Sequence, residues 1–347
     1  MGRSCTANVV FLLLAVLVAG CQQSTAPVVG PSPAKSPDLS AKAWQRQEPG
    51  VGAIRAIVID PRANGMIYAA TSDGVMKSTN AGAHWQKTGA FKIRDTRALA
   101  IDPKSPDVLY AGSANGIVSK TTDGGATWQP LTVPLSRPLP VRALVVDPHD
   151  SATVYAAIPR TGIVKSTDGG ATWKAVVEGL TELDVRALAV DPSTPATVYV
   201  GTNGKGFFKS SDGGTTWHES NKGLTNHVLR AVAIDTTTPR TLYVATSGFG
   251  VYKSTDAGDT WADASKGLTS KVVAALTIDP TSSTTIYAGA AGGALAKTTD
   301  GGATWIDIKP RTRRQIWSIT LDPKDPKTVY VGTAGDGIFK STTGGEG

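Results

Sequence analysis

Short apolar stretches alternate with glycine- and proline-containing turns along most of the chain. In one unit, apolar and β-branched residues fill 185–190, 197–201 and 207–210, separated by the turn sequences DPSTP, NGKG and DGG. Thr216-Trp217 then opens a further strand. Runs of this length between such turns predict four short antiparallel strands, and the unit has no helical periodicity.

The unit recurs along the chain. A tryptophan returns every 43 to 45 residues, at Trp85, Trp128, Trp173, Trp217, Trp261 and Trp305. A marker aspartate recurs in step, at Asp60, Asp102, Asp147, Asp191, Asp235, Asp279 and Asp322. Eight residues after each marker stands a tyrosine: Tyr68, Tyr110, Tyr155, Tyr199, Tyr243, Tyr287 and Tyr330. Four strands in about 44 residues match one blade of a β-propeller. The seven markers therefore predict an all-β fold, a single seven-bladed β-propeller of four-stranded antiparallel blades.

The first strand of each unit pairs a small residue with a bulky one. Four residues before the marker stand Ala56, Ala98, Ala143, Ala187, Ala231, Ala275 and Ser318, and the following residue is Ile, Leu or Val in every unit. Because innermost strands converge on the propeller axis, one face must be slim while the other fills the space to the next blade.

The closure of the ring can also be predicted. The seventh unit ends at Gly347 before reaching a tryptophan, whereas Trp44 precedes the first marker, Asp60, with nearly the usual spacing. We expect the segment around Trp44 to supply the outer strand of the last blade, which leaves no open edge between the first and last blades. The predicted propeller domain spans residues 43–347.

The N-terminal segment carries a different pattern. Residues 9–19 form an apolar run of eleven, too short to span a bilayer and suited to a signal-peptide core. It ends in LVAGC, which resembles a bacterial lipobox. The resemblance implies a signal peptide at 1–20, a lipid on Cys21, and, because Gln22 is not Asp, the outer membrane, facing the periplasm or the cell surface. Residues 21–42 are rich in proline and serine and predict an extended tether. Ordinary secretion, which would leave Cys21 as an odd thiol, is the alternative.

Charge and cysteine content limit the possible chemistry. The chain has two cysteines, and if Cys5 leaves with the signal and Cys21 is lipidated, the folded domain has no thiol for a disulfide or a zinc–thiolate site. The four histidines have no metal-ligand spacing, and no cofactor-binding motif is present. A net charge of +7 suits anionic partners, but nucleic acid is not expected behind an export signal.

The turn before each tryptophan carries a specific motif. The sequence STDGGATW ends at Trp173, and close variants end at Trp85, Trp128, Trp217, Trp261 and Trp305, the first with Asn80 in place of Asp. This resembles the Asp-box, or bacterial neuraminidase repeat. In that family the box stabilises turns at the propeller periphery, away from the active site. The resemblance therefore implies a structural role for Asp123, Asp168, Asp212, Asp256 and Asp300, and no catalytic residue is assigned.

The sequence gives little support for an enzymatic activity. Sialidases use a Tyr–Glu nucleophile pair and an arginine motif before the first Asp-box, and neither can be identified in this sequence. Xyloglucan-cleaving glycoside hydrolases of the Asp-box group use two propellers, and this chain has one. Glycoside hydrolysis still requires only two suitably spaced carboxylates, which Asp73, Asp336, Asp95 and Asp184 can supply. Solvated turn aspartates are the simpler interpretation, but a hydrolase or glycan-binding protein remains the alternative.

One basic feature repeats without an obvious structural need. Five residues before the marker, five blades carry Arg55, Arg97, Arg142, Arg186 and Arg230, and the last two blades carry Ala274 and Trp317. These positions start the innermost strands, so we expect them at one mouth of the central channel. Because arginine binds carboxylates through two hydrogen bonds, we predict a docking face for an acidic ligand, with Trp317 as an aromatic anchor. Passive copying of the repeat, with neutralisation by Asp95 and Asp184, would also explain the pattern.

The VRALxxDP strands and STDGGxTW turns together resemble the photosystem II assembly and stability factor family. Its members are Asp-box seven-bladed propellers with an arginine-rich face that bind a client protein. Together with the lipobox-like sequence, the resemblance implies a non-catalytic envelope lipoprotein that acts as an interaction or assembly scaffold for a client with an acidic surface. We expect it to be a monomer. The sequence does not identify the client or a photosynthetic host.

Overall fold

The computed structural model describes residues 43–47, 52–62, 65–89 and 94–346. They belong to one compact unit, Leu39–Gly347. The predicted signal peptide, the tether and Cys21 lie outside the described residues, so lipidation stays a prediction. The described ranges contain no helix that is long and apolar enough to cross a membrane.

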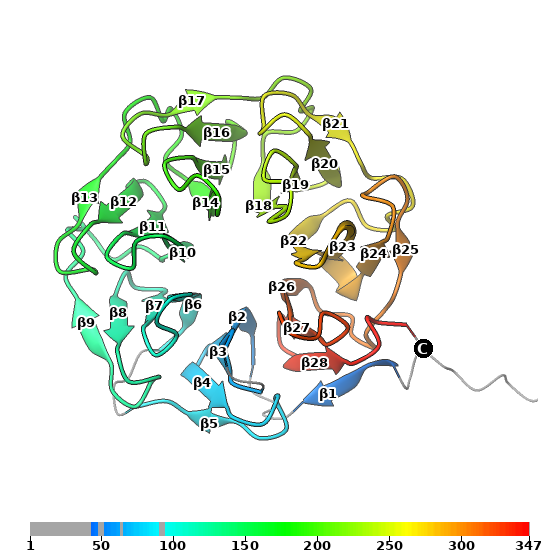
Figure 1. Cartoon of the computed structure of the whole chain (residues 1–347), viewed down its shortest axis with the longest axis horizontal. Coiled ribbons are helices and arrows are strands. Elements are labelled where there is room, and N and C mark those ends of the chain that lie inside the picture. The colour runs from blue at the N-terminus through cyan, green and yellow to red at the C-terminus, as the bar shows by residue number, and fades with distance from the viewer. Residues whose placement is uncertain (1–42, 48–51, 63–64, 90–93, 347) are drawn as a thin grey trace, which may run out of the picture. The chain divides into compact units, whose positions relative to one another are not determined.

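Seven four-stranded antiparallel sheets stand around a common centre, which confirms the predicted all-β propeller (Figure 1). The innermost strands are β2 (Ile54–Ile59), β6 (Thr96–Ile101), β10 (Ala143–Val146), β14 (Val185–Val190), β18 (Leu229–Ile234), β22 (Val273–Asp279) and β26 (Ile316–Leu321). We number the blades 1 to 7 in that order.

Each blade then runs outward. The second strands are β3 (Ile67–Thr71), β7 (Leu109–Ser113), β11 (Val154–Ile158), β15 (Val198–Thr202), β19 (Leu242–Thr246), β23 (Ser282–Ala290) and β27 (Val329–Thr333). The third strands are β4 (Gly74–Ser78), β8 (Val118–Thr121), β12 (Gly162–Ser166), β16 (Phe207–Ser210), β20 (Val251–Ser254), β24 (Leu295–Thr298) and β28 (Ile338–Ser341). The outermost strands are β5 (Gln86–Lys87), β9 (Gln129–Leu131), β13 (Lys174–Ala175), β17 (His218–Glu219), β21 (Ala262–Asp263), β25 (Ile306–Asp307) and, in blade 7, β1 (Gln45–Gln47). A 3-10 turn, η1 (Ala291–Gly293), joins β23 to β24.

The ring closes as the sequence predicts. Strand β1 pairs antiparallel with β28, with Arg46 opposite Phe339. Just before it, Trp44 is only 7% exposed, and its indole Nε1 donates to the Ile308 carbonyl of blade 6 at 2.8 Å. The N-terminal segment therefore completes blade 7 and leaves that sheet without an unpaired outer edge at β28.

The repeated tyrosines lie between neighbouring blades, and six of the seven form a hydrogen bond to the next blade. All seven are buried on second strands. In six of them the hydroxyl donates to a carbonyl in the Asp-box turn of the following blade, as Tyr68 does to Gly124 at 3.0 Å. A third-strand lysine donates to the same carbonyl in five blades, as Lys77 does to Gly124 at 2.9 Å. Burial and these hydrogen bonds together fix the spacing between blades.

Candidate binding site at the arginine-lined mouth of the central channel

The local backbone explains where the five arginines point. In six blades the pairing of the innermost strand with the second strand skips one residue, as between Ile54 and Ala56. The skipped residue is Arg55, Arg97, Arg186, Arg230, Ala274 or Trp317. A β-bulge of this kind redirects a side chain away from the regular alternation of the strand. In blade 3, Arg142 lies immediately before β10, and its backbone N–H donates to the Ala157 carbonyl at 2.8 Å.

The bulges gather these side chains around one space. The five arginines, Ala274, Trp317 and Gln315 line a cavity of about 350 Å³. Because every blade contributes a residue from the start of its innermost strand, this cavity lies at one mouth of the central channel. The structure thus brings together all six residues that the sequence singled out. Whether they bind a ligand stays a prediction.

Two carboxylates offset part of the positive charge. Asp95 Oδ2 lies 2.9 Å from Arg97 Nη2, and its Oδ1 lies 3.6 Å from Arg55 Nε. Asp184 Oδ2 accepts from Arg186 Nη2 and from Asn203 Nδ2, both at 2.9 Å. Arg142 and Arg230 form no ion pair with any described residue, and Arg230 donates only to the Ser247 hydroxyl at 3.2 Å. Five guanidinium groups against two carboxylates leave the mouth strongly positive.

Burial and neighbouring arginines lower the pKa values of three of these side chains. Burial and then the neighbouring Arg97 lower the pKa of Arg55, against the opposing effect of Asp95. Burial and then Arg186 lower the pKa of both Arg142 and Arg230. Partial loss of water and like-charge repulsion both disfavour the charged form, but arginine stays protonated in proteins. An anion entering the mouth would relieve both effects.

Trp317, predicted as an aromatic anchor, packs against one arginine of the ring. The Arg55 guanidinium carbon lies 4.1 Å from the centre of the Trp317 ring, so one face of the indole is already occupied by a cation. This contact spans the junction of blades 1 and 7 and holds Arg55 in place. Trp317 still lines the cavity and is half-buried.

Asp95 and Asp184, which the sequence suggested as neutralising groups, do pair with arginines of the mouth. Asp95 and Asp184 stand two residues before Arg97 and Arg186. The same repeat position holds Gln315 two residues before Trp317, and Gln315 also lines the cavity. Comparing this position across blades would have identified the second set of mouth residues.

The four carboxylates considered for hydrolysis are mostly engaged. Asp95 and Asp184 pair with the arginines above. Asp336 Oδ2 accepts from the Thr312 hydroxyl at 2.7 Å, and its Oδ1 lies 3.8 Å from Arg314 Nε. Asp73 has no side-chain hydrogen bond or ion pair with a described residue. The described part of the chain also contains no group of three or more His, Cys, Asp or Glu side chains placed to hold a metal ion.

The Asp-boxes show the geometry of a turn-stabilising motif. Asp168 Oδ1 accepts from the Ser166 hydroxyl and the Thr172 N–H, each at 2.8 Å, and its Oδ2 accepts from the Thr172 hydroxyl at 2.6 Å. These hydrogen bonds lower the pKa of Asp168 to about 2. Asp123, Asp212, Asp256 and Asp300 repeat the arrangement. In an antiparallel blade these turns lie at the end opposite the arginine mouth.

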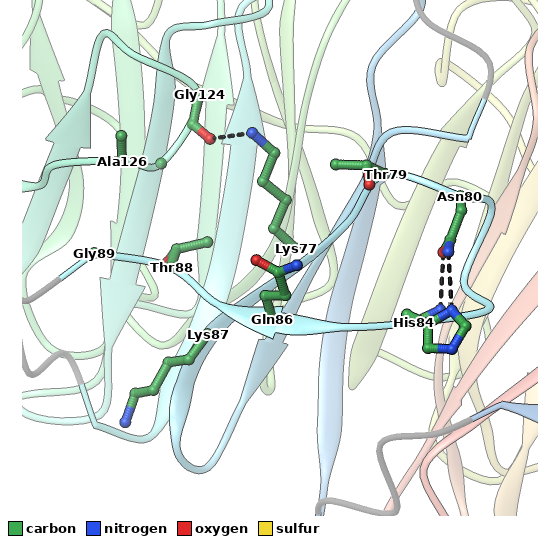
Figure 2. A pocket seen from close by; sticks show the side chains of 11 residues that line it. Lys77, Thr79, Asn80, His84, Gln86, Lys87, Thr88, Gly89, Gly124 and Ala126 are labelled. Carbon is green, nitrogen blue, oxygen red and sulfur yellow. Dashed lines mark hydrogen bonds between the residues drawn. The ribbon is translucent and has the colours of Figure 1, made fainter.

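A second cavity, of about 480 Å³, lies at the outer junction of blades 1 and 2 (Figure 2). Its Lys77 amine is directed at the Gly124 carbonyl, and Asn80 and His84 face each other with Nδ2 and Nδ1 3.0 Å apart. A similar cavity lies between blades 5 and 6 around Lys253 and Gly301. Both follow from the repeat, and their amines already serve the contacts between blades.

Comparison with known proteins gives a family match. The model of the family described as photosynthesis system II assembly factor YCF48 matches residues 37–342. No curated protein matches the chain.

Among solved structures, the chain is similar to a GH74 enzyme from Niastella koreensis, with 23% identity, a TM-score of 0.72, and coverage of 85% of this chain and 53% of the enzyme. It is similar to YCF48 bound to D1 peptide, with 17% identity, a TM-score of 0.68, and coverage of 87% and 96%. It is also similar to YCF48 from Cyanidioschyzon merolae, with 16% identity, a TM-score of 0.67, and coverage of 86% and 98%. The chain spans about half the length of the GH74 enzyme, and at these identities the likeness shows the propeller fold alone.

Proposed function

The chain belongs to the family of photosynthesis system II assembly factor YCF48, and from this premise we propose that it is an assembly-factor scaffold that binds an acidic segment of a client protein at its arginine mouth. The observation that carries the proposal is the convergence of five arginines from five blades on one cavity, where among the described residues only two carboxylates, Asp95 and Asp184, form ion pairs with them. A related propeller has been solved with a D1 peptide, which supports a peptide as the kind of ligand.

The chemistry of the mouth favours a carboxylate-bearing segment. Arg142 and Arg230 have no carboxylate partner among the described residues, and they flank the Arg186–Asp184 pair in the order of the blades. Hydrogen bonds between ionised partners are shorter and stronger than neutral ones, and a guanidinium offers two parallel N–H groups to one carboxylate. A client carboxylate between these arginines would gain those bonds and reduce the repulsion within the ring.

The location of the protein is part of the same proposal. A lipid on Cys21, followed by the proline- and serine-rich segment up to residue 42, would hold the propeller near a bacterial envelope membrane. The support is the LVAGC sequence after the apolar run. Metabolic labelling with a radioactive fatty acid tests it: the full chain should incorporate label, and Cys21→Ser should not.

The direct test measures binding of an aspartate-rich peptide by fluorescence anisotropy. We expect the double variant Arg142→Ala and Arg230→Ala to bind at least about tenfold more weakly, because each lost charge-assisted hydrogen bond contributes about 1.5–3 kcal/mol. Binding to the unchanged protein should also weaken as salt is added, since the mouth is partly open to solvent. Arg240→Ala is the control, because Arg240 is an exposed arginine at the opposite end of the blades.

The outcomes separate two functions. If the double variant binds the peptide as well as the control does, the arginine mouth is not the client site. If the protein hydrolyses or binds xyloglucan and ignores acidic peptides, the carbohydrate-active alternative, which rests on the GH74-like fold, replaces the proposal.

A further inference from the structure

A third cavity opens beside the arginine mouth. Its volume is about 670 Å³, and its walls include Leu139, Pro140, Pro159 and Leu183 together with Arg160. We call it the blade 3 groove, because the connections before and after blade 3 and the β11–β12 hairpin surround it. Arg142 lines both this groove and the arginine mouth, so the two spaces are adjacent.

One side of the groove comes from the connection before blade 3. Residues 132–142, between β9 and β10, form the longest of the six links between consecutive blades. The link contains Pro134, Pro138 and Pro140. Leu139 is partly buried against the core between blades 2 and 3. Proline restricts the free chain, so a ligand binding here loses little to the ordering of its site.

The β11–β12 hairpin at the groove carries a second departure from the repeat. Arg160 has a positive φ of 64°, at a hairpin position where four other blades have glycine: Gly204, Gly248, Gly292 and Gly335. A non-glycine residue in this conformation costs about 1–2 kcal/mol. The Arg160 guanidinium forms no ion pair with any described residue. Arg160 therefore adopts an unfavourable backbone conformation although its guanidinium forms no ion pair with a described residue.

The blade 3 groove and the arginine mouth differ in their net charge. Arg142 lines both spaces, and Asp184 pairs with Arg186 of the mouth at 2.9 Å. The groove adds only one further charge of each sign, Arg160 and Glu182, so it brings no additional excess of charge. The mouth beside it keeps an excess of arginine. A ligand lying across both would place its acid in the mouth and an uncharged, apolar side chain in the groove.

We propose that the blade 3 groove is a second subsite of the client site, which takes a leucine-sized apolar side chain next to the acidic residues bound in the mouth. This rests on the proposed function and narrows it: the recognised segment is an extended peptide with a carboxylate cluster and a nearby apolar residue. An acidic segment without the apolar residue binds through the mouth alone.

Two synthetic glycine- and serine-based peptides test the subsite. Both carry a run of aspartates, and one also carries a leucine, placed at several spacings from the acids in a small series. At the best spacing we expect the leucine to strengthen binding about tenfold, which corresponds to about 1.4 kcal/mol.

Filling the groove should remove that gain. Thr181 is exposed and lines the groove, so Thr181→Trp would occupy it without touching the core. The variant should bind both peptides equally, with the affinity that the unchanged protein has for the leucine-free peptide. Thr269→Trp is the repeat-matched control: Thr269 follows Gly267-Leu268 as Thr181 follows Gly179-Leu180, but it does not line the groove. Melting temperatures of both variants check the fold.

Each result has a distinct meaning. If the leucine-free peptide binds and leucine adds nothing at any spacing, the groove proposal is wrong while the arginine mouth stands. If Thr181→Trp keeps the leucine gain, the apolar side chain binds elsewhere and the groove proposal is also wrong. If neither peptide binds, the proposed function itself fails.

Discussion

One of the seven repeat tyrosines contacts its neighbouring blade differently from the others. Tyr199 is fully buried like the other six repeat tyrosines, but its hydroxyl has no hydrogen-bond partner among the described residues. Beside it stands Phe207, where other blades have Val118, Ile163 or Val251. The two rings stack with their centres 5.5 Å apart, and Phe207 also packs edge-on against Trp261. Between blades 4 and 5, aromatic packing thus takes the place of the tyrosine hydroxyl–carbonyl hydrogen bond that links the other pairs of blades.

A matched pair of substitutions tests this exchange. Tyr155→Phe removes a hydroxyl that donates to the Gly213 carbonyl at 3.0 Å, and should lower the free energy of unfolding by about 1 kcal/mol. Tyr199→Phe removes an unpartnered buried hydroxyl and should leave stability unchanged or raise it. Urea denaturation of both variants provides the measurement. Equal losses would mean that the Tyr199 hydroxyl has a partner, such as a bound water.

At the scale of elements, the short strand β1 has an effect beyond its three residues. It completes the sheet of blade 7, and Trp44 in front of it is buried against blade 6. Other tryptophans make the same kind of link, since Trp217 donates to Val176 and Trp261 donates to Ser220 of the preceding blades. Trp85 and Trp173 instead donate to Gly82 and Gly170 within their own turns, at 2.9 and 3.0 Å, and of these two Trp85 is only partly buried.

This difference predicts unequal costs for two tryptophan substitutions. Trp44→Ala removes a buried indole and its hydrogen bond to Ile308, and should destabilise the protein by about 3–5 kcal/mol. Trp85→Ala should cost clearly less, because that side chain keeps more contact with water. Chemical denaturation followed by tryptophan fluorescence checks both. A Trp44→Ala protein as stable as Trp85→Ala would show that ring closure does not depend on the N-terminal segment.

At the scale of the whole molecule, the two ends of the propeller have separate tasks. The Asp-box turns lie at one end, where the following-blade contacts of tyrosine and lysine hold the ring together. The arginine mouth and the blade 3 groove lie at the other end. This separation allows loops at the mouth to vary, as the 132–142 link does, without loosening the contacts at the box end.

The Asp-boxes also set how the whole protein responds to acid. The pKa values of Asp123, Asp168, Asp212 and Asp256 are lowered to about 2, with hydrogen bonds from the box Thr as the leading cause, and that of Asp300 is lowered as well. A folded pKa below the unfolded value of 3.8 means that the stabilisation is complete above 3.8 and is lost as the pH falls through about 2. We therefore expect a steep loss of stability in this window.

The pH effect can be assigned with one substitution. Asn80 shows that a box tolerates asparagine, so Asp168→Asn should fold. Its stability deficit should be largest near neutral pH and should shrink as the pH falls through about 2, because the unchanged protein then loses the same charge. Urea midpoints measured across the pH series give the comparison. A deficit that does not depend on pH would show that the charge of Asp168 contributes nothing to folding.

The sequence alone determined the number of blades, the strand order, the closure by the segment around Trp44 and the boxes. These features follow from spacing along the chain, because each blade is built from neighbouring residues and the period repeats their contacts. Placing the five arginines at the start of the innermost strands was enough to predict that they converge. Their position in the repeat carried that information.

Only the tertiary structure decided how the charges of the arginine mouth are compensated. The sharing of Asp95 by two arginines from different blades and the stacking of Arg55 on Trp317 join residues that are far apart or meet only when the ring closes. The bulges that turn these side chains inward depend on pairing with the second strand. The groove forms where three separate loops meet around blade 3. No spacing rule encodes such contacts, because they arise from the packing of whole blades against one another.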